Sequence, residues 1–136
     1  MTVKVLFEDT FKVVAMMDGA ECPAEQFLLA DDASTLAQRS GLLTMLEHAA
    51  RMGLQHVPSG WLHEADKQRG IYEFIKGPLR LFFFKGANGD IAVCTFGVRK
   101  SGQKADKAAV AKSAKMKAAY EEAIKTGTYK VITDEN

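Results

Sequence analysis

Three short hydrophobic runs, separated by turn residues, dominate the middle of the chain. They cover residues 71–75, 79–84 and 91–98, with Gly77-Pro78 and Asn88-Gly89 between them. Short runs rich in β-branched and aromatic residues are typical of strands, while these dipeptides favour tight turns. The pattern therefore predicts a three-stranded antiparallel meander.

The middle run is apolar at every position except Arg80. A short, continuously apolar run is typical of a strand covered on both faces, so this run is predicted to be central in the sheet. Because a guanidinium keeps its charge, Arg80 must reach solvent, a sheet end or an anionic partner. Two interpretations stay open: the side chain reaches the surface or pairs with Glu73 or Asp90, or it binds an anionic ligand.

The last third of the chain follows a helical pattern with two distinct sides. At about 100° per residue, one side carries Ala109, Ser113, Met116, Tyr120, Ala123 and Ile124. The other side carries Lys104, Lys107, Lys112 and Lys115. We expect the first side to pack on the sheet and the basic stripe to face solvent.

The first half of the chain combines strand and helix signals. Residues 3–7 predict a strand, and residues 11–17 leave open a second one. Pro23 fits the first turn of a short helix. Residues 34–52 predict a longer helix, with Leu36 on its apolar side, that ends at Gly53.

Two segments have weaker patterns. Residues 54–66 are interpreted as a connector, and residues 128–133 as either a last short strand or an ordered tail. The 136 residues are enough for one domain with its own core. We therefore expect a single α+β domain, in which helices pack against a small antiparallel sheet.

The overall charge hides an asymmetry between the two halves. The formal net charge is +1, but residues 1–60 carry −4 and residues 61–136 carry +5. Residues 99–117 hold seven basic side chains and one acidic one, Asp106. A localised positive segment favours a polyanionic partner such as nucleic acid, although a solvated helix face can have the same composition.

Cysteine and histidine spacing argues against a metal site. Cys22 and Cys94 form no CxxC pair, and His48, His56 and His63 show no ligand spacing with either thiol. We expect no metal, no small-molecule cofactor and a reduced, cytoplasmic setting. The chain also lacks a signal-peptide pattern and an apolar run of roughly 20 residues, so no membrane partner is expected.

Five short motifs occur in order over nearly the whole chain. They are Cys22-Pro23-Ala24-Glu25-Gln26-Phe27, Met52-Gly53-Leu54, Ile71-Tyr72-Glu73-Phe74, Leu79-Arg80-Leu81-Phe82 and Phe96-Gly97-Val98-Arg99-Lys100-Ser101. Their order and spacing resemble the RelE/ParE toxin superfamily, and most closely its phage-derived, HigB-like branch. The chain departs from that pattern in three places. Ile75 and Lys76 replace the usual arginine of the third motif, Lys104-Ala105 replaces a Thr-Pro, and the last third has no histidine.

The resemblance implies a RelE-like fold and a toxin of a type II toxin–antitoxin system. Such toxins act as ribosome-dependent mRNA endoribonucleases, in which a 2′-hydroxyl attacks the adjacent phosphate. The implied partners are mRNA on the ribosome and a cognate antitoxin, a small helix-turn-helix protein.

The same resemblance implies the site residues. Arg80 would stabilise the transition state, because a guanidinium can contact two phosphoryl oxygens. Arg99 and Lys100 would hold the flanking phosphates or share that role. The RNA-positioning residues would be Lys76, Lys85, Lys104, Lys107 and Lys112. This hypothesis requires Arg80, Arg99 and Lys100 to converge in one solvent-reachable pocket.

No general base stands out in the sequence. Tyr72 and Tyr120 lie in core-like contexts and are interpreted as packing residues, and His63 as a surface residue. The alternative function is a binding module without nuclease activity. It would be either a ParE-like gyrase inhibitor or an inactive phage-derived domain that binds nucleic acid or protein.

Overall fold

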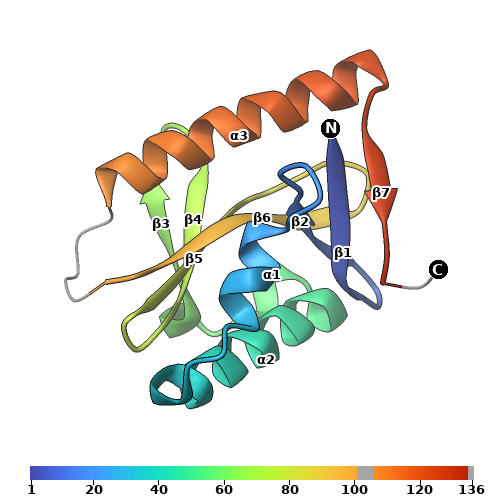
Figure 1. The fold of residues 1–136 in the computed structure, drawn as a ribbon. Helices are drawn as coiled ribbons and strands as arrows, with labels where there is room; N and C mark the ends of the chain where they lie inside the picture. The colour runs from blue at the N-terminus through green and yellow to red at the C-terminus, as the bar shows by residue number, and fades with distance from the viewer. Residues whose placement is uncertain (101–105, 135–136) are drawn as a thin grey trace.

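The computed structural model describes residues 1–100 and 106–134. In this part of the chain, a seven-stranded sheet lies between α1 (Pro23–Leu28) and α2 (Leu36–Met52) on one face and α3 (Lys107–Thr126) on the other (Figure 1). The strands are β1 (Thr2–Glu8), β2 (Lys12–Met16), β3 (Leu62–Asp66), β4 (Ile71–Lys76), β5 (Leu79–Phe84), β6 (Asp90–Arg99) and β7 (Lys130–Ile132). The predicted α+β class is confirmed.

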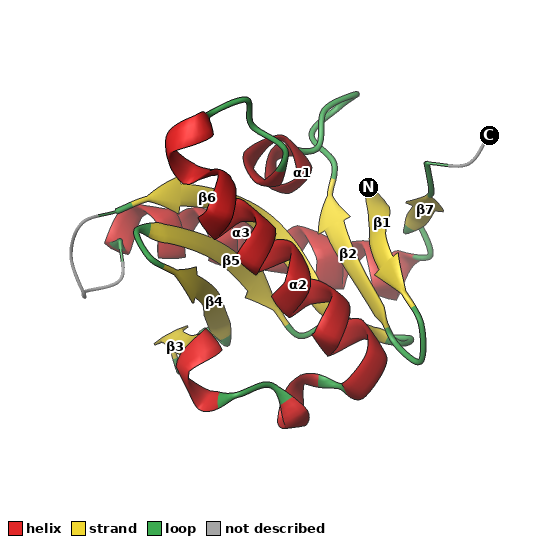
Figure 2. Cartoon of the chain, turned by 90° about the horizontal axis from the view of Figure 1, so that it is seen from below, coloured by secondary structure: helices red, strands yellow, loops and turns green. Residues whose placement is uncertain are grey.

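The strand order is β3-β4-β5-β6-β2-β1-β7, with β3 and β7 at opposite edges (Figure 2). The predicted meander is present as β4, β5 and β6, and the N-terminal segment forms an antiparallel hairpin of β1 and β2. The sheet is mixed, however, because β2 pairs with β6 and β1 with β7 in parallel. The segment containing α1 and α2 carries the chain from β2 to the far edge of the sheet, at β3. Three antiparallel pairings then lead from β3 through β4 and β5 to β6, which runs parallel to β2.

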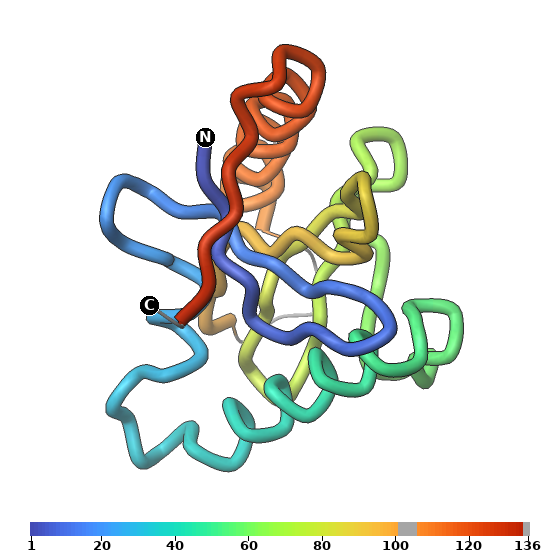
Figure 3. Tube along the Cα trace, turned by 90° about the vertical axis from the view of Figure 1, so that its right-hand side faces the viewer, coloured from blue at the N-terminus to red at the C-terminus, as the bar shows by residue number. Residues whose placement is uncertain are grey.

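One edge strand was not predicted. Residues 54–66, interpreted as a connector, contain two short 3₁₀ turns and then β3. The middle residues of β3, His63 and Glu64, are exposed, so this strand lacks the apolar alternation by which strands are recognised. At the other edge β7 lies beside β1, which settles the last segment as a strand (Figure 3).

Strand β5 is buried along its whole length, as predicted for a central strand. Leu79, Leu81 and Phe83 pack in the core under α1 and α2, whereas Phe82 and Phe84 pack in the core under α3. Because side chains alternate along a strand, Arg80 lies on the α3 face with Phe82 and Phe84.

The two long helices match their predicted faces to different degrees. In α3, Ala109, Ser113, Tyr120 and Ala123 are buried, as the helical pattern predicts. In α2, the prediction is wrong for Leu36, which is 58% exposed because the helix begins there and its first turn is not covered.

The close approach of α1 to β6 gives a test of this packing. A Cβ on Gly97 would overlap the ring of Phe27, so Gly97→Ala should push α1 away from the sheet. We expect a loss of about 1–3 kcal/mol in the free energy of unfolding, measured by urea titration. Gly60→Ala is the control, because no atom lies within 4 Å of its added Cβ. Equal losses in both variants would contradict this packing.

Candidate functional site

Ionisable side chains from three adjacent strands form a line on the α3 face, which we call the His63–Glu73–Arg80 line. Nδ1 of His63 lies 3.5 Å from Oε1 of Glu73, and Nε of Arg80 lies 3.4 Å from the same oxygen. The register explains this geometry. His63 pairs with Glu73 across β3 and β4, and Arg80 pairs with Ile75, two residues along the same face of β4. The imidazole and the guanidinium therefore meet at one carboxylate oxygen.

Burial differs sharply along the line. Glu73 is 1% exposed and Arg80 7%, whereas the His63 side chain is 48% exposed. A buried carboxylate needs a compensating charge, and Arg80 supplies it. The imidazole is thus the member of the line that a large ligand can reach directly.

The Arg80 guanidinium is held by acceptors of the protein itself. One terminal nitrogen, Nη1, donates to the carbonyl of Gly77 at 2.6 Å and to that of Leu79 at 3.1 Å. Together with the ion pair to Glu73, these contacts bear out one of the interpretations left open, namely that Arg80 pairs with Glu73. A contact with a substrate phosphate would compete with them.

Arg99 lies on the opposite face of the sheet from Arg80. It pairs with Leu79, which packs under α2, and its Nη1 lies 3.7 Å from Oδ2 of Asp32, next to that helix. The predicted convergence of Arg80 and Arg99 in one pocket is therefore wrong. Any role of either residue in binding RNA stays a prediction.

A β-bulge is the physical reason for this separation. The register between β5 and β6 shifts between Leu81 and Phe83, so two successive residues of β6, Thr95 and Phe96, lie on the α3 face. Regular alternation from Val93 would have placed Arg99 on that face as well. The bulge reverses the facing of every later residue of β6.

Arg99 lies in open surroundings, whereas Lys100 is half-buried. The Arg99 side chain is 60% exposed, so solvent screens its ion pair with Asp32. Hydrogen bonds from the Ser34 hydroxyl and amide are the main cause that lowers the pKa of Asp32, and Arg99 adds less. Lys100 donates its backbone N–H to the carbonyl of Pro78 at 2.7 Å, just beyond β6.

Two of the predicted RNA-positioning lysines lie on the α1/α2 face. The stem of Lys76 lies against Gly41 of α2. The Lys85 ammonium lies 5.1 Å from the centroid of the Tyr72 ring. Neither lysine is near the His63 imidazole, which is on the other face of the sheet.

The remaining predicted lysines belong to the α3 segment. Lys107 is the exposed first residue of α3, and the Lys112 ammonium lies 4.5 Å from the centroid of the Phe96 ring. Lys104 lies outside the described residues. The described members of the predicted RNA-positioning set therefore occupy both faces of the sheet and do not form one surface.

From the sequence, Glu73 was named as a possible partner of Arg80 and His63 was interpreted as a surface residue, but their contact was not predicted. Glu73 is the single charged residue in the apolar run Ile71–Ile75, so its burial in the sheet requires a cation beside it. The place of His63 beside Glu73 could not be predicted, because the strand that carries His63 was not recognised.

A second polar cluster lies under the C-terminal end of α3. Asp90 is buried, and its Oδ2 accepts hydrogen bonds from the hydroxyls of Tyr120, at 2.8 Å, and Tyr129. Lys12 Nζ lies 3.5 Å from Oδ1, and the Ala87 N–H donates to the Tyr120 hydroxyl at 3.0 Å. This cluster ties α3 and the chain before β7 to the turn between β5 and β6.

The two phenols of this cluster stay protonated at neutral pH. Burial raises the pKa of Tyr120 to about 12, and the Asp90 carboxylate adds to the rise. Burial, followed by Asp90, also raises the pKa of Tyr129. Both groups are therefore donors that hold the fold together, in agreement with the interpretation of Tyr120 as a packing residue.

Other reactive side chains offer little chemistry. Cys22 and Cys94 are buried free thiols, and burial raises the pKa of each, which makes them poor nucleophiles. Within residues 1–100 and 106–134, no three His, Cys, Asp or Glu side chains gather as metal ligands would. In the same residues, no helix combines the length and apolar character needed to cross a membrane.

Removing the cation of the line tests its role in stability. Arg80→Met leaves the Glu73 carboxylate buried without its partner, so we expect the free energy of unfolding to fall by about 3–5 kcal/mol. Adding Glu73→Gln should recover part of this loss. Arg99→Met, at the exposed pair, should change stability by less than about 1 kcal/mol. Similar losses for Arg80→Met and Arg99→Met in urea titrations would show that the buried pair carries no special weight.

The Asp90 cluster predicts a loss of stability in alkali. The folded state holds the Tyr120 proton to about pH 12, whereas an unfolded tyrosine releases it near its ordinary pKa of about 10. The resulting stabilisation is therefore complete below about pH 10 and is lost as the pH rises through about 12. Tyr120→Phe should lower neutral-pH stability by about 1–3 kcal/mol and weaken this pH dependence. Thermal melts from about pH 8 to about pH 12, a range that spans the ordinary tyrosine pKa, would measure this. Tyr72→Phe leaves the cluster intact and should show the same dependence of stability on pH as the wild type.

The chemistry of the site has to be inferred from its own side chains. The chain matches no protein-family model and no curated protein. The geometry that remains as the basis for function is a half-exposed imidazole, a buried carboxylate beside it, and a guanidinium that balances the carboxylate.

Proposed function

We propose that this chain is a RelE-like toxin domain that cleaves RNA through attack of a ribose 2′-hydroxyl on the adjacent phosphate. The observation that carries the proposal is the contact between His63 and Glu73, 3.5 Å from Nδ1 to Oε1, with the imidazole half exposed. It supplies the acid/base group that the sequence interpretation lacked.

The proposed step places the general base on His63. With its Nδ1–H donated to Glu73, the neutral imidazole presents Nε2 as the acceptor of the 2′-hydroxyl proton. The 2′-oxygen forms the new bond to phosphorus while the bond to the 5′-oxygen breaks, and that oxygen takes a proton from water. The products are a 2′,3′-cyclic phosphate and a 5′-hydroxyl end. The Glu73 carboxylate stabilises the imidazolium that forms.

Arg80 takes a different role from the one expected of it. Its contacts to Glu73, Gly77 and Leu79 make it a positioning residue that holds the carboxylate in place. Attraction of the RNA backbone then falls to exposed cations of α3, which covers the same face as His63, among them Lys107 and Lys112. The predicted partners are unchanged: mRNA on the ribosome and a cognate helix-turn-helix antitoxin in the cytoplasm.

A second candidate function is a toxin-fold module that binds without cutting. The observation that favours it is the burial of Arg80, because a guanidinium held by internal acceptors does not face a substrate phosphate. In that case the target is DNA gyrase, as for ParE-like toxins, or a nucleic acid or protein that the domain only binds.

Replacing His63 distinguishes the two functions. We expect His63→Ala to reduce mRNA cleavage in a ribosome-containing translation extract by about 10²- to 10⁴-fold, the usual contribution of a general base. His56→Ala is the matched control, since His56 is an exposed residue of the turn at residues 54–56. Primer extension would map the cut sites, and the new ends should carry 5′-hydroxyls.

Equal cleavage by wild type and His63→Ala would reject His63 as the general base. Arrested growth on induction, with intact transcripts and blocked DNA supercoiling, would reject the nuclease and support the gyrase-binding function.

A further inference from the structure

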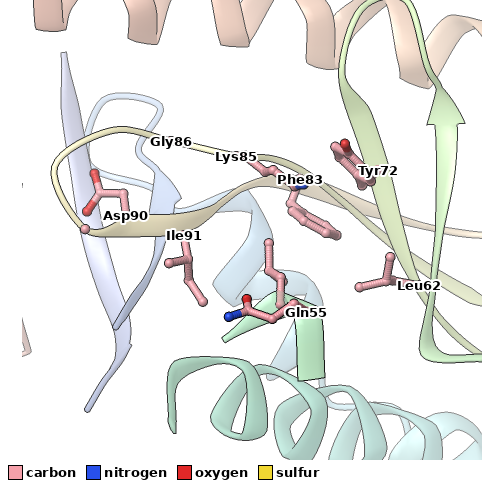
Figure 4. Close-up of a pocket in the computed structure, with 10 residues that line it drawn as sticks. Gln55, Leu62, Tyr72, Phe83, Lys85, Gly86, Asp90 and Ile91 are labelled. Atoms are coloured by element: carbon pink, nitrogen blue, oxygen red, sulfur yellow. The ribbon is translucent and has the colours of Figure 1, made fainter. Parts of the chain in front are cut away.

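A cavity of about 410 Å³ opens on the face of the sheet opposite to His63. Its apolar lining includes Leu62 of β3, Tyr72 of β4, Phe83 of β5 and Ile91 of β6, and Gln55 and Lys85 add polar groups (Figure 4). The volume falls within the range of about 300–1,000 Å³ that is typical of small-molecule sites. The lining residues come from β3, β4, β5 and β6, from the turn after α2 and from the turn between β5 and β6.

The two aromatic rings of this lining, Phe83 and Tyr72, belong to a stack that extends to Phe74 outside the cavity. Phe74 and Phe83 stack with centroids 4.4 Å apart and planes 21° apart, and Tyr72 continues the stack at 5.4 Å and 24°. Phe74 and Phe83 are fully buried, whereas Tyr72 is only partly buried. Tyr72 is therefore the ring that a ligand can reach, and its flat surface favours a planar ligand.

The exposed charge in the lining of the cavity is the Lys85 ammonium. The Lys85 ammonium lies over the Tyr72 ring, and among the described residues no carboxylate forms an ion pair with it. Lys4, by contrast, contacts Glu25 at 2.7 Å.

One carboxylate does line the cavity, but it is engaged elsewhere. Asp90 accepts hydrogen bonds from Tyr120 and Tyr129 and lies 3.5 Å from Lys12. An exposed ammonium beside apolar and aromatic side chains thus favours a ligand that has both an anionic group and an apolar part.

We propose that this cavity binds a planar heteroaromatic ring that carries an anionic group, in the form of a nucleoside monophosphate. The exposed Lys85 side chain swings off the Tyr72 ring, and the base takes its place against Tyr72 and the aliphatic side chains of Leu62 and Ile91. The ammonium then pairs with the phosphate. The Gln55 amide, with both a donor and an acceptor, can bind the polar edge of the base. Such a nucleotide has two sources, a free mononucleotide or the terminal nucleotide of an RNA strand.

Each part of this recognition has an expected effect on affinity. Stacking on one aromatic side chain contributes about 1–3 kcal/mol per base, so Tyr72→Leu should weaken AMP binding roughly 5- to 150-fold. Lys85→Met keeps the aliphatic stem and removes the charge, and should weaken AMP binding about tenfold. It should leave the weaker binding of adenosine unchanged, since adenosine carries no anionic group.

The experiment is calorimetric titration of the folded wild-type chain with AMP, UMP, adenosine, ribose 5-phosphate and inorganic phosphate. AMP and UMP should bind saturably and more tightly than the other three. Lys76→Met is the matched control, because this lysine lies on the same face of the sheet but outside the cavity. An RNA trinucleotide that binds more tightly than AMP would identify an RNA end as the source, and weaker binding would identify the free nucleotide.

Three results would overturn the proposal. They are the absence of saturable AMP and UMP binding at millimolar concentration, competition by inorganic phosphate as strong as that by AMP, and equal loss of affinity in Lys76→Met and Lys85→Met. The outcome is independent of RNA cleavage, because His63→Ala should bind AMP as the wild type does. Failure of nucleotide binding and failure of the nuclease can therefore be told apart.

Discussion

Two-sided burial of the sheet is the constraint on which the rest of this structure depends. Helices cover both faces of the central strands, so each charged side chain on those strands must find its partner on its own face. Glu73 and Arg80 meet this requirement as diagonal neighbours on β4 and β5. The same pairing holds Arg80 inside the protein and leaves the His63 imidazole as the exposed end of the line.

The order of elements and the strongly patterned segments could be predicted from the sequence, because their signals are local. A continuously apolar run marked β5 as central, and the spacing of Ala109, Ser113 and Tyr120 marked the buried side of α3. Edge strand β3 escaped prediction because its exposed residues show no alternation. Whether a chain segment pairs at an edge depends on its neighbour more than on its own residues.

The candidate site depended on information that local patterns do not contain. The motif at the end of β6 suggested that Arg99 would join Arg80, and regular alternation from Val93 supports that expectation. The bulge at Thr95 and Phe96 reverses it by inserting one residue into the pairing with β5. A single extra residue moves every later side chain to the other face, so the site could not be assembled without the register.

That bulge also has a structural function, which explains why the sheet keeps it. It turns Phe96 toward α3 beside Thr95, whose hydroxyl contacts that of Ser113 at 2.8 Å. On the opposite face it brings Gly97 under the Phe27 ring, where α1 packs closely. The bulge therefore allows the single strand β6 to pack against helices on both faces of the sheet. It also leaves two separate sets of reactive side chains back to back, with His63 on one face and Lys85 on the other. The buried strands of the sheet separate the two sets, so a substitution in one set removes no contact of the other.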